Sequence, residues 1–136
     1  MKKYFTCILI TSCLFLLSAC GHQEEDSDTI RNRIADNTYI YEKEGFGGDF
    51  TIRLNSDGTF SYYEGNLSSL IGMGNWKLEE DVLILSHNLP DNESAEYSWV
   101  NYFQINGNDL VFLSKDSTNF HYVTVSDGER FSASSR

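Results

Sequence analysis

The chain has 136 residues, of which 40% are hydrophobic and 14% aromatic, and it contains one proline. Its 20 acidic and 10 basic residues give a net charge of −10, which disfavours nucleic-acid binding because the phosphate backbone attracts basic surfaces. The cysteines, Cys7, Cys13 and Cys20, all lie at the N-terminus, so disulfides, thiolate metal sites and a cysteine nucleophile are excluded from the rest of the chain.

The N-terminal segment has the features of an export signal. Two lysines precede an apolar run over residues 4–17 that is too short to cross a bilayer as a helix. The run ends at Leu17-Ser18-Ala19-Cys20, which resembles the site at which bacterial lipoproteins are cleaved and lipidated. The resemblance implies that residues 1–19 are a signal peptide and that Cys20 carries the lipid. The protein would then be anchored in the cell envelope, on the extracytoplasmic face of a bacterial membrane.

Two alternatives to this anchor stay open. Ile10-Thr11-Ser12-Cys13 also fits the pattern loosely, but cleavage there would leave a short apolar core and a product that begins with residues 14–17, all of them apolar or aromatic. The other alternative is a secreted protein without a lipid. If the protein is lipidated, two or more acyl chains would hold it on the membrane, where a single chain gives only marginal binding.

The residues that follow Cys20 resemble a tether. Residues 21–33 are rich in glutamate and aspartate, and Ile30 is their only large apolar side chain. Such a segment cannot bury enough apolar surface to offset the entropy lost on ordering. We therefore predict a flexible acidic tether over residues 20–36 and one folded domain over residues 37–136.

Within that domain, short segments of alternating apolar and polar residues are separated by turn sequences such as Asn55-Ser56-Asp57-Gly58 and Asn106-Gly107-Asn108. This pattern predicts an all-β antiparallel meander of about eight or nine strands. Exposed strand edges invite aggregation, so we expect the meander to close as a small barrel, with a two-sheet sandwich as the alternative. The predicted strands are 38–42, 49–54, 59–63, a segment with Trp76 and Leu78, 82–85, 95–105, 109–113, 120–125 and 129–133.

Residues 66–74 do not fit the alternation. Leu67, Leu70 and Ile71 fall at helical spacing between glycines, which predicts a short helical turn or a flexible loop. Apolar side chains on such a loop, Met73 included, often serve as binding elements. They could instead plug one end of the barrel as ordinary core.

Several short motifs are similar to those of the small lipocalin-like barrels found in bacterial lipoproteins: Asp57-Gly58-Thr59-Phe60, Gly74-Asn75-Trp76, Leu83-Ile84-Leu85 and Leu110-Val111-Phe112. The similarity covers about residues 37–133 and implies ligand or protein binding rather than catalysis. The copper-associated outer-membrane relatives of this barrel carry a Cys-x-x-Cys pair, which this chain lacks.

The alternation also predicts which side chains face the barrel interior. A barrel of about eight strands has an interior just wide enough for side chains or one small ligand, so large inward residues should leave at most a shallow pocket at one mouth. Asn101 shares the inward face, and a buried amide needs hydrogen-bond partners, so it marks a bulge, an internal water or the polar point of a pocket. The predicted inward residues are Phe50, Ile52, Leu54, Phe60, Tyr62, Trp76, Leu78, Tyr97, Trp99, Phe103, Ile105, Leu110 and Phe112.

No pattern of residues points to catalysis or to a cofactor. His87 and His121 lack the paired spacing of metal ligands, and the turn at residues 55–58 is followed by strand residues where a calcium loop needs further oxygen ligands. We therefore expect a non-catalytic, membrane-anchored binding module for a small apolar ligand or an envelope protein. The alternative is a structural or envelope-stress accessory lipoprotein with a packed barrel and no ligand. The candidate binding residues are Leu67, Leu70, Ile71, Met73, Trp99 and Asn101.

Overall fold

The computed structural model describes residues 25–42, 49–65, 71–87, 99–118, 120 and 123–134. The predicted signal peptide and Cys20 lie outside these ranges, as do Leu67, Leu70 and His121. The elements within them are α1 (Ser27–Ile34), β1 (Thr38–Tyr41), β2 (Phe50–Leu54), β3 (Thr59–Glu64), β4 (Ile71–Glu79), β5 (Val82–His87), β6 (Val100–Asn106), β7 (Asp109–Phe112) and β8 (Arg130–Ala133).

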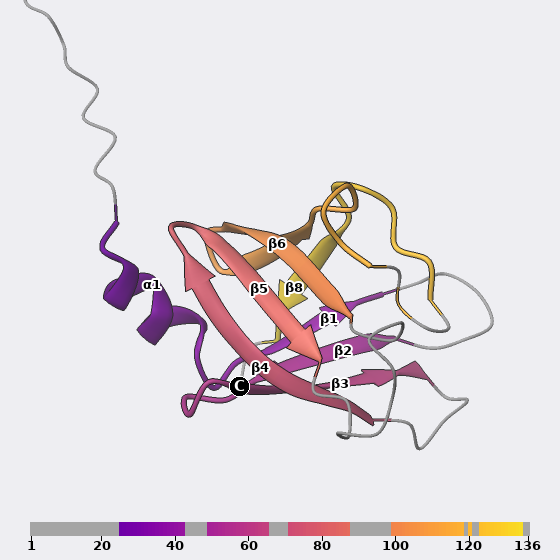
Figure 1. Ribbon diagram of the computed structural model, residues 1–136, viewed down its shortest axis with the longest axis horizontal. Helices are drawn as coiled ribbons and strands as arrows, with labels where there is room; N and C mark the ends of the chain where they lie inside the picture. The colour runs from indigo at the N-terminus through magenta and orange to yellow at the C-terminus, as the bar shows by residue number, and fades with distance from the viewer. Residues whose placement is uncertain are drawn as a thin grey trace, which may run out of the picture.

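The eight strands form one closed antiparallel barrel (Figure 1). Each strand pairs with the next along the chain, and β8 returns to β1, with Tyr39 opposite Ala133 and Ile40 opposite Ser132. The predicted all-β meander and its closure are thus confirmed, and the two-sheet alternative is excluded. Closure pairs the first and last strands, whose edges would otherwise be exposed.

The barrel interior is packed with aromatic rings. Burial alternates along β2, β3, β6 and β7 as a strand with one inward face requires. Phe131 lies edge-on to Phe50 and Phe103, with ring centroids 5.5 and 5.2 Å apart. Of the predicted inward residues, Leu78 and Trp99 are only partly buried and Tyr97 lies outside the described ranges. The others are buried, as predicted.

The predicted strand over residues 120–125 is wrong. Phe120 and the described residues 123–125 lie in the connection between β7 and β8, which pair directly with each other. Phe120 and Val125 are nevertheless buried and belong to the core cluster. Their apolar spacing therefore marks side chains that a loop inserts into the core, and not a strand.

The prediction for residues 66–74 is wrong from Ile71 onward, because β4 begins there and pairs with β3. Gly72 lies opposite Tyr62 and faces inward, where a β-carbon would collide with the Tyr62 ring. The glycine is therefore required by the close approach of an aromatic ring. The absence of large inward side chains at this end of β4 is what hid the strand in the sequence.

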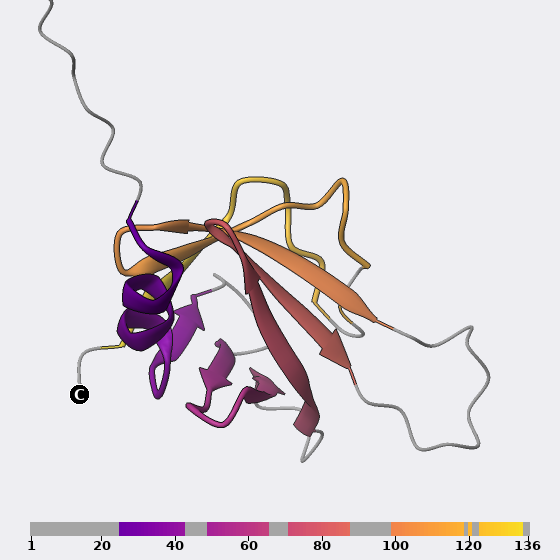
Figure 2. The same cartoon turned by 60° about the vertical axis from the view of Figure 1, so that its left-hand side comes forward.

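The predicted tether is wrong for residues 27–34, which form α1. Ile30 and Ile34 are four residues apart, so they share one helical face, and both are buried in the core cluster. Asp28 in the first turn and arginines in the last turn match the helix dipole. The Arg31 guanidinium lies 4.4 Å from the centre of the Trp76 ring. The helix covers one end of the barrel, as two views show (Figure 1 and Figure 2).

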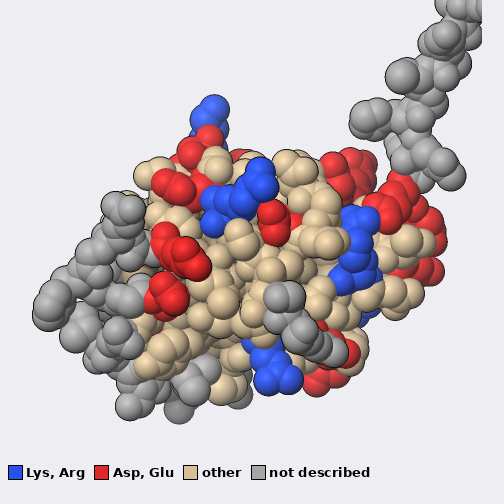
Figure 3. All heavy atoms as spheres, turned by 180° about the vertical axis from the view of Figure 1, so that it is seen from behind, with Lys and Arg blue, Asp and Glu red and all other residues tan. Residues whose placement is uncertain are grey.

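Charged side chains are spread over the outside of the barrel. On the face seen in Figure 3, acidic groups gather around α1 and again toward the opposite end, with basic groups between them. Among the described residues, no helix is long and apolar enough to cross a membrane.

Candidate functional site

The meander gives the barrel two different ends. The hairpin turns after β2, β4 and β6 lie at the end covered by α1, which we call the capped end (Figure 1). Strands β1, β3, β5 and β7 finish at the other end, which no described helix covers and which we call the open end. Binding sites of small barrels form at such mouths, so the open end is the place to look for function.

Three polar residues occupy inward positions at the open end. Glu64 continues the inward alternation of Phe60 and Tyr62 along β3. His87 ends β5 two residues after the buried Leu85. Asn101 lies on β6 opposite that same leucine. Sequence reasoning identified Asn101 but assigned no binding role to Glu64 or His87; extending the period of two to the strand ends would have found both.

An aromatic cluster, which we call the aromatic mouth, is formed here by Tyr62, His87, Trp99 and Phe120. The Tyr62 and Trp99 rings are nearly parallel, at 19° and a centroid distance of 6.3 Å. The His87 ring stands almost perpendicular to both, 6.0 Å from Tyr62 and 5.6 Å from Trp99. Tyr62 is buried, whereas His87 and Trp99 remain partly exposed, so these two rings are the part of the cluster that reaches solvent.

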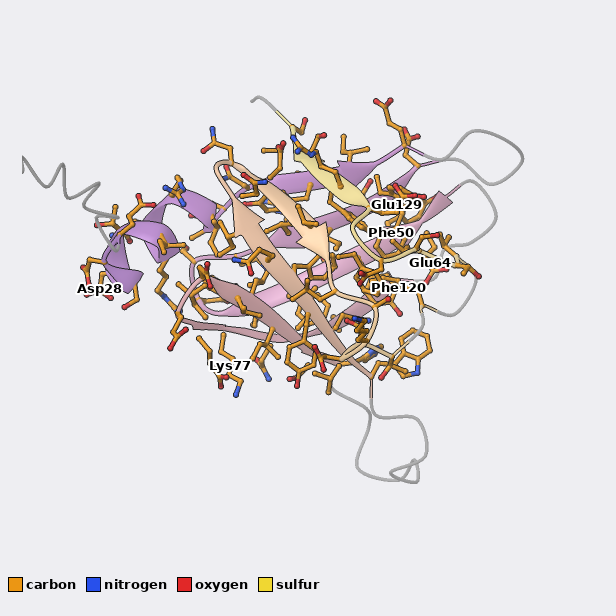
Figure 4. The ribbon with its side chains drawn as sticks, turned by 90° about the horizontal axis from the view of Figure 1, so that it is seen from above. Asp28, Phe50, Glu64, Lys77, Phe120 and Glu129 are labelled. Atoms are coloured by element: carbon orange, nitrogen blue, oxygen red, sulfur yellow. The ribbon has the colours of Figure 1, made fainter. Side chains whose placement is uncertain are left out.

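Phe120 joins this mouth to the filled core. Its ring lies 6.2 Å from Tyr62 and 4.6 Å from Phe50. Glu64 pairs with Phe50 in the sheet register, and the three labelled side chains lie in the same part of the barrel when it is viewed from above (Figure 4). Below this level the interior is occupied by side chains, so a ligand would contact the mouth and not the centre of the barrel.

Burial favours the neutral forms of Tyr62 and His87. The pKa of Tyr62 is raised far above its usual range, first by burial and then by the negative charge of Glu64. Burial lowers the pKa of His87 below 6.5, and its Nδ1 atom is buried with no hydrogen-bond partner among the described residues. At neutral pH the mouth therefore presents a neutral phenol, a neutral imidazole and an indole, which suit apolar or aromatic contacts.

Asn101 has a structural explanation. Its side-chain nitrogen donates a hydrogen bond to the Thr118 carbonyl oxygen at 2.6 Å. Two further bonds join the same segments: the Tyr102 amide donates to Ser117 Oγ at 2.8 Å, and the Thr118 amide donates to the Val100 carbonyl at 2.8 Å. The Asn101 side chain thus helps to hold the segment that follows β7 against β6, beside Trp99.

Of the remaining predicted binding residues, Met73 does not join this cluster. Met73 is 59% exposed and points outward from β4, between two inward-facing glycines. Ile71 is the first residue of β4, and Leu67 and Leu70 lie outside the described ranges. The structure therefore places Trp99 and Asn101 at the open end and Met73 on the outer wall of β4, so the prediction that Met73 lies in a loop is wrong.

Other indications of function are sparse. Within the ranges that the structure covers, no three His, Cys, Asp or Glu side chains come together as a metal site would require. Comparison of the chain with protein-family models, with curated proteins and with solved structures finds no match. The features of the chain that point to a function are the aromatic mouth and the N-terminal motif.

Proposed function

We propose that the protein is an extracytoplasmic lipoprotein, anchored to a bacterial membrane through Cys20. Its lipocalin-like barrel would act as a non-catalytic binding module for a small apolar ligand or an envelope protein. The observation that carries the proposal is the aromatic mouth, where Trp99 and His87 stay partly exposed above a covered aromatic core. Partly exposed aromatic rings with polar groups beside them are typical of recognition surfaces.

The filled interior limits what such a module can hold. Phe50, Phe103, Phe112 and Phe131 are each at most 1% exposed, and they occupy the space that a carried ligand would need. A ligand would therefore lay one ring or a short aliphatic end against Trp99 and His87. A partner protein could insert a single apolar side chain in the same way.

The position of α1 supports binding from the aqueous side. Six residues, 21–26, separate Cys20 from α1, and six residues reach about 20 Å when fully extended. A lipid on Cys20 would hold the capped end close to the bilayer, with the open end directed away from it. This arrangement favours a soluble ligand or an envelope protein over a membrane lipid.

The packed core also favours the second candidate function, that of a structural or envelope-stress accessory lipoprotein without a ligand. In that case the aromatic mouth would be a stabilising cluster, and its partly exposed rings would bind no ligand. The two candidates differ in one measurable property, which is whether the mouth takes up an apolar molecule.

Dye binding tests the mouth. Full-length protein in nonionic micelles is titrated with the neutral dye Nile red, and every variant is measured in the same micelles so that micelle-bound dye is a constant background. We expect Trp99→Ala to weaken the protein-dependent signal about tenfold, the loss of one well-placed aromatic contact. Met73→Ala, an exposed apolar residue on the outer wall, is the matched control and should bind as the unaltered protein does. No dye uptake by the unaltered protein would favour the accessory role.

Fatty-acid labelling tests the anchor. Cells are grown with a labelled fatty acid, and the protein is recovered from membrane and soluble fractions. We expect Cys20→Ser to lose both the label and the membrane association, whereas Cys13→Ser keeps both. The opposite pattern would move the cleavage site to Cys13, and label in neither protein would indicate a secreted protein without a lipid.

A further inference from the structure

The outer wall of the barrel carries a second candidate site, distinct from the aromatic mouth. A hollow of about 550 Å³ lies on the outside of β5 and β6. We call it the outer groove. Its lining consists of Glu79, Glu80, Val82, Ile84, Tyr102, Leu113 and Asp116, all of which the structure describes.

The floor of the outer groove is apolar, although it belongs to the outer face of the sheet. Leu83 and Leu85 face the core, so the strand period directs Ile84 outward, yet Ile84 is only 5% exposed. Its register neighbours are Lys77 on β4 and Tyr102 on β6. The Leu113 amide donates a hydrogen bond to the Tyr102 carbonyl at 2.9 Å, which brings the Leu113 side chain into the same lining.

The rim of the outer groove is acidic. Glu79 and Glu80 belong to the β4–β5 hairpin, and Asp116 follows β7; all three are exposed. Lys77 forms an ion pair with Glu79 at 2.5 Å. The rim carboxylates that could attract a cationic ligand are therefore those of Glu80 and Asp116. Lys77 points outward from the barrel wall (Figure 4). Among the residues that line the groove there is no lysine or arginine.

We infer that the outer groove is a docking surface for a cationic amphipathic segment of a partner protein. Aliphatic side chains of such a segment would cover the partly exposed Val82, Tyr102 and Leu113, and its lysine or arginine side chains would lie against Glu80 and Asp116. The charge complementarity extends beyond the groove, because the whole chain carries a net charge of −10. The rim would set encounter rate and specificity, and the apolar floor would supply most of the affinity.

A peptide-binding measurement tests this surface. The probe is a fluorescent leucine–lysine peptide, titrated by anisotropy into full-length protein in nonionic micelles at low salt, with the same micelles for every variant. We expect the double reversal Glu80→Lys with Asp116→Lys to weaken binding about tenfold, since it replaces two attractions by two repulsions. Added salt should weaken binding to the unaltered protein, because the rim charges are exposed. Leu113→Ala should weaken binding without altering the salt dependence.

The matched control reverses two exposed carboxylates at the open end, Glu42→Lys with Asp49→Lys, so that net charge changes equally but the outer groove is intact. Binding should then stay within about twofold of the unaltered protein at moderate salt. Equal weakening by both reversals, or equal binding of a leucine–glutamate peptide, would overturn the proposal. Self-association of the protein that the groove reversal abolishes would assign the surface to a second copy and would also overturn it.

Discussion

Gly72→Ala is expected to destabilise the barrel through a single steric conflict. A β-carbon at this position would lie within 3.0 Å of Cε1 and Cζ of Tyr62 and 2.6 Å from its hydroxyl oxygen. Normal contact distances of about 3.5–4.0 Å would require the ring to move by about 1.5 Å. Tyr62 is 3% exposed and packs against Phe50, Phe60 and Phe120, so the ring cannot move without disturbing the core.

The size of the effect follows from two opposing contributions. Overpacking a filled core costs about 1–3 kcal/mol. Alanine restricts the unfolded chain more than glycine does, which returns about 0.4–1 kcal/mol where the backbone conformation suits both residues. Gly72 is not among the residues with a positive φ angle, so the second contribution applies. Because the ring must move by about 1.5 Å, we take the overpacking cost from the upper half of its range, about 2–3 kcal/mol, and the net expected loss in the free energy of unfolding is then about 1–2.6 kcal/mol.

A double-mutant cycle separates this mechanism from a general loss of strand stability. Urea unfolding is followed by tryptophan fluorescence for Gly72→Ala alone, for Tyr62→Val alone and for both together. Valine has no ring over Gly72, so in that background alanine should be neutral or stabilising by about 0.4–1 kcal/mol. An equal loss in both backgrounds, or an alanine variant as stable as the unaltered protein, would refute the steric explanation.

Two further predictions concern α1 and the aromatic mouth. Ile34 is fully buried in the core, so Ile34→Ala should lower the free energy of unfolding by about 2–5 kcal/mol in a urea titration. Asn32 is exposed on the same helix, so Asn32→Ala should change it by no more than about 0.5 kcal/mol. Equal losses in the two variants would contradict the packing of α1. Burial lowers the pKa of His87 below its ordinary 6.5, so the unfolded chain takes up a proton first as pH falls. His87 therefore stabilises the fold above pH 6.5, and this contribution is lost as pH falls through the folded-state pKa. The urea midpoint should fall with pH over that range, and His87→Gln should remove this pH dependence.

The sequence by itself determined the fold class and most of the strand positions. Alternation with a period of two, as in Phe50, Ile52 and Leu54, is sufficient to direct one face of a strand inward. Turn residues that accept a positive φ, such as Gly107 at 62°, fixed the positions of the hairpins. Both signals are local, so they can be read without knowledge of neighbouring strands.

Three elements depended on contacts that the sequence does not record. The helix α1 is stable because its two isoleucines are buried against the end of the barrel. In isolation the same acidic segment has too little apolar surface to form a stable helix. The inward positions at the start of β4 are glycines because aromatic rings of β3 occupy the space that their side chains would need. Phe120 is buried from a loop, where strand periodicity carries no information.

The inward-facing residues of the open end divide in the same way. The period of two sets the inward direction of Tyr62, Glu64, His87 and Asn101, and this local signal continues to the strand ends. Only the closed barrel decides that these residues, which come from three strands, meet at one end while α1 covers the other. Exposure is likewise a tertiary property: Trp99 and Tyr62 are both large aromatic residues, but their neighbours leave only Trp99 partly open to solvent. Burial depends on neighbours that are distant in the chain, and no local pattern specifies them.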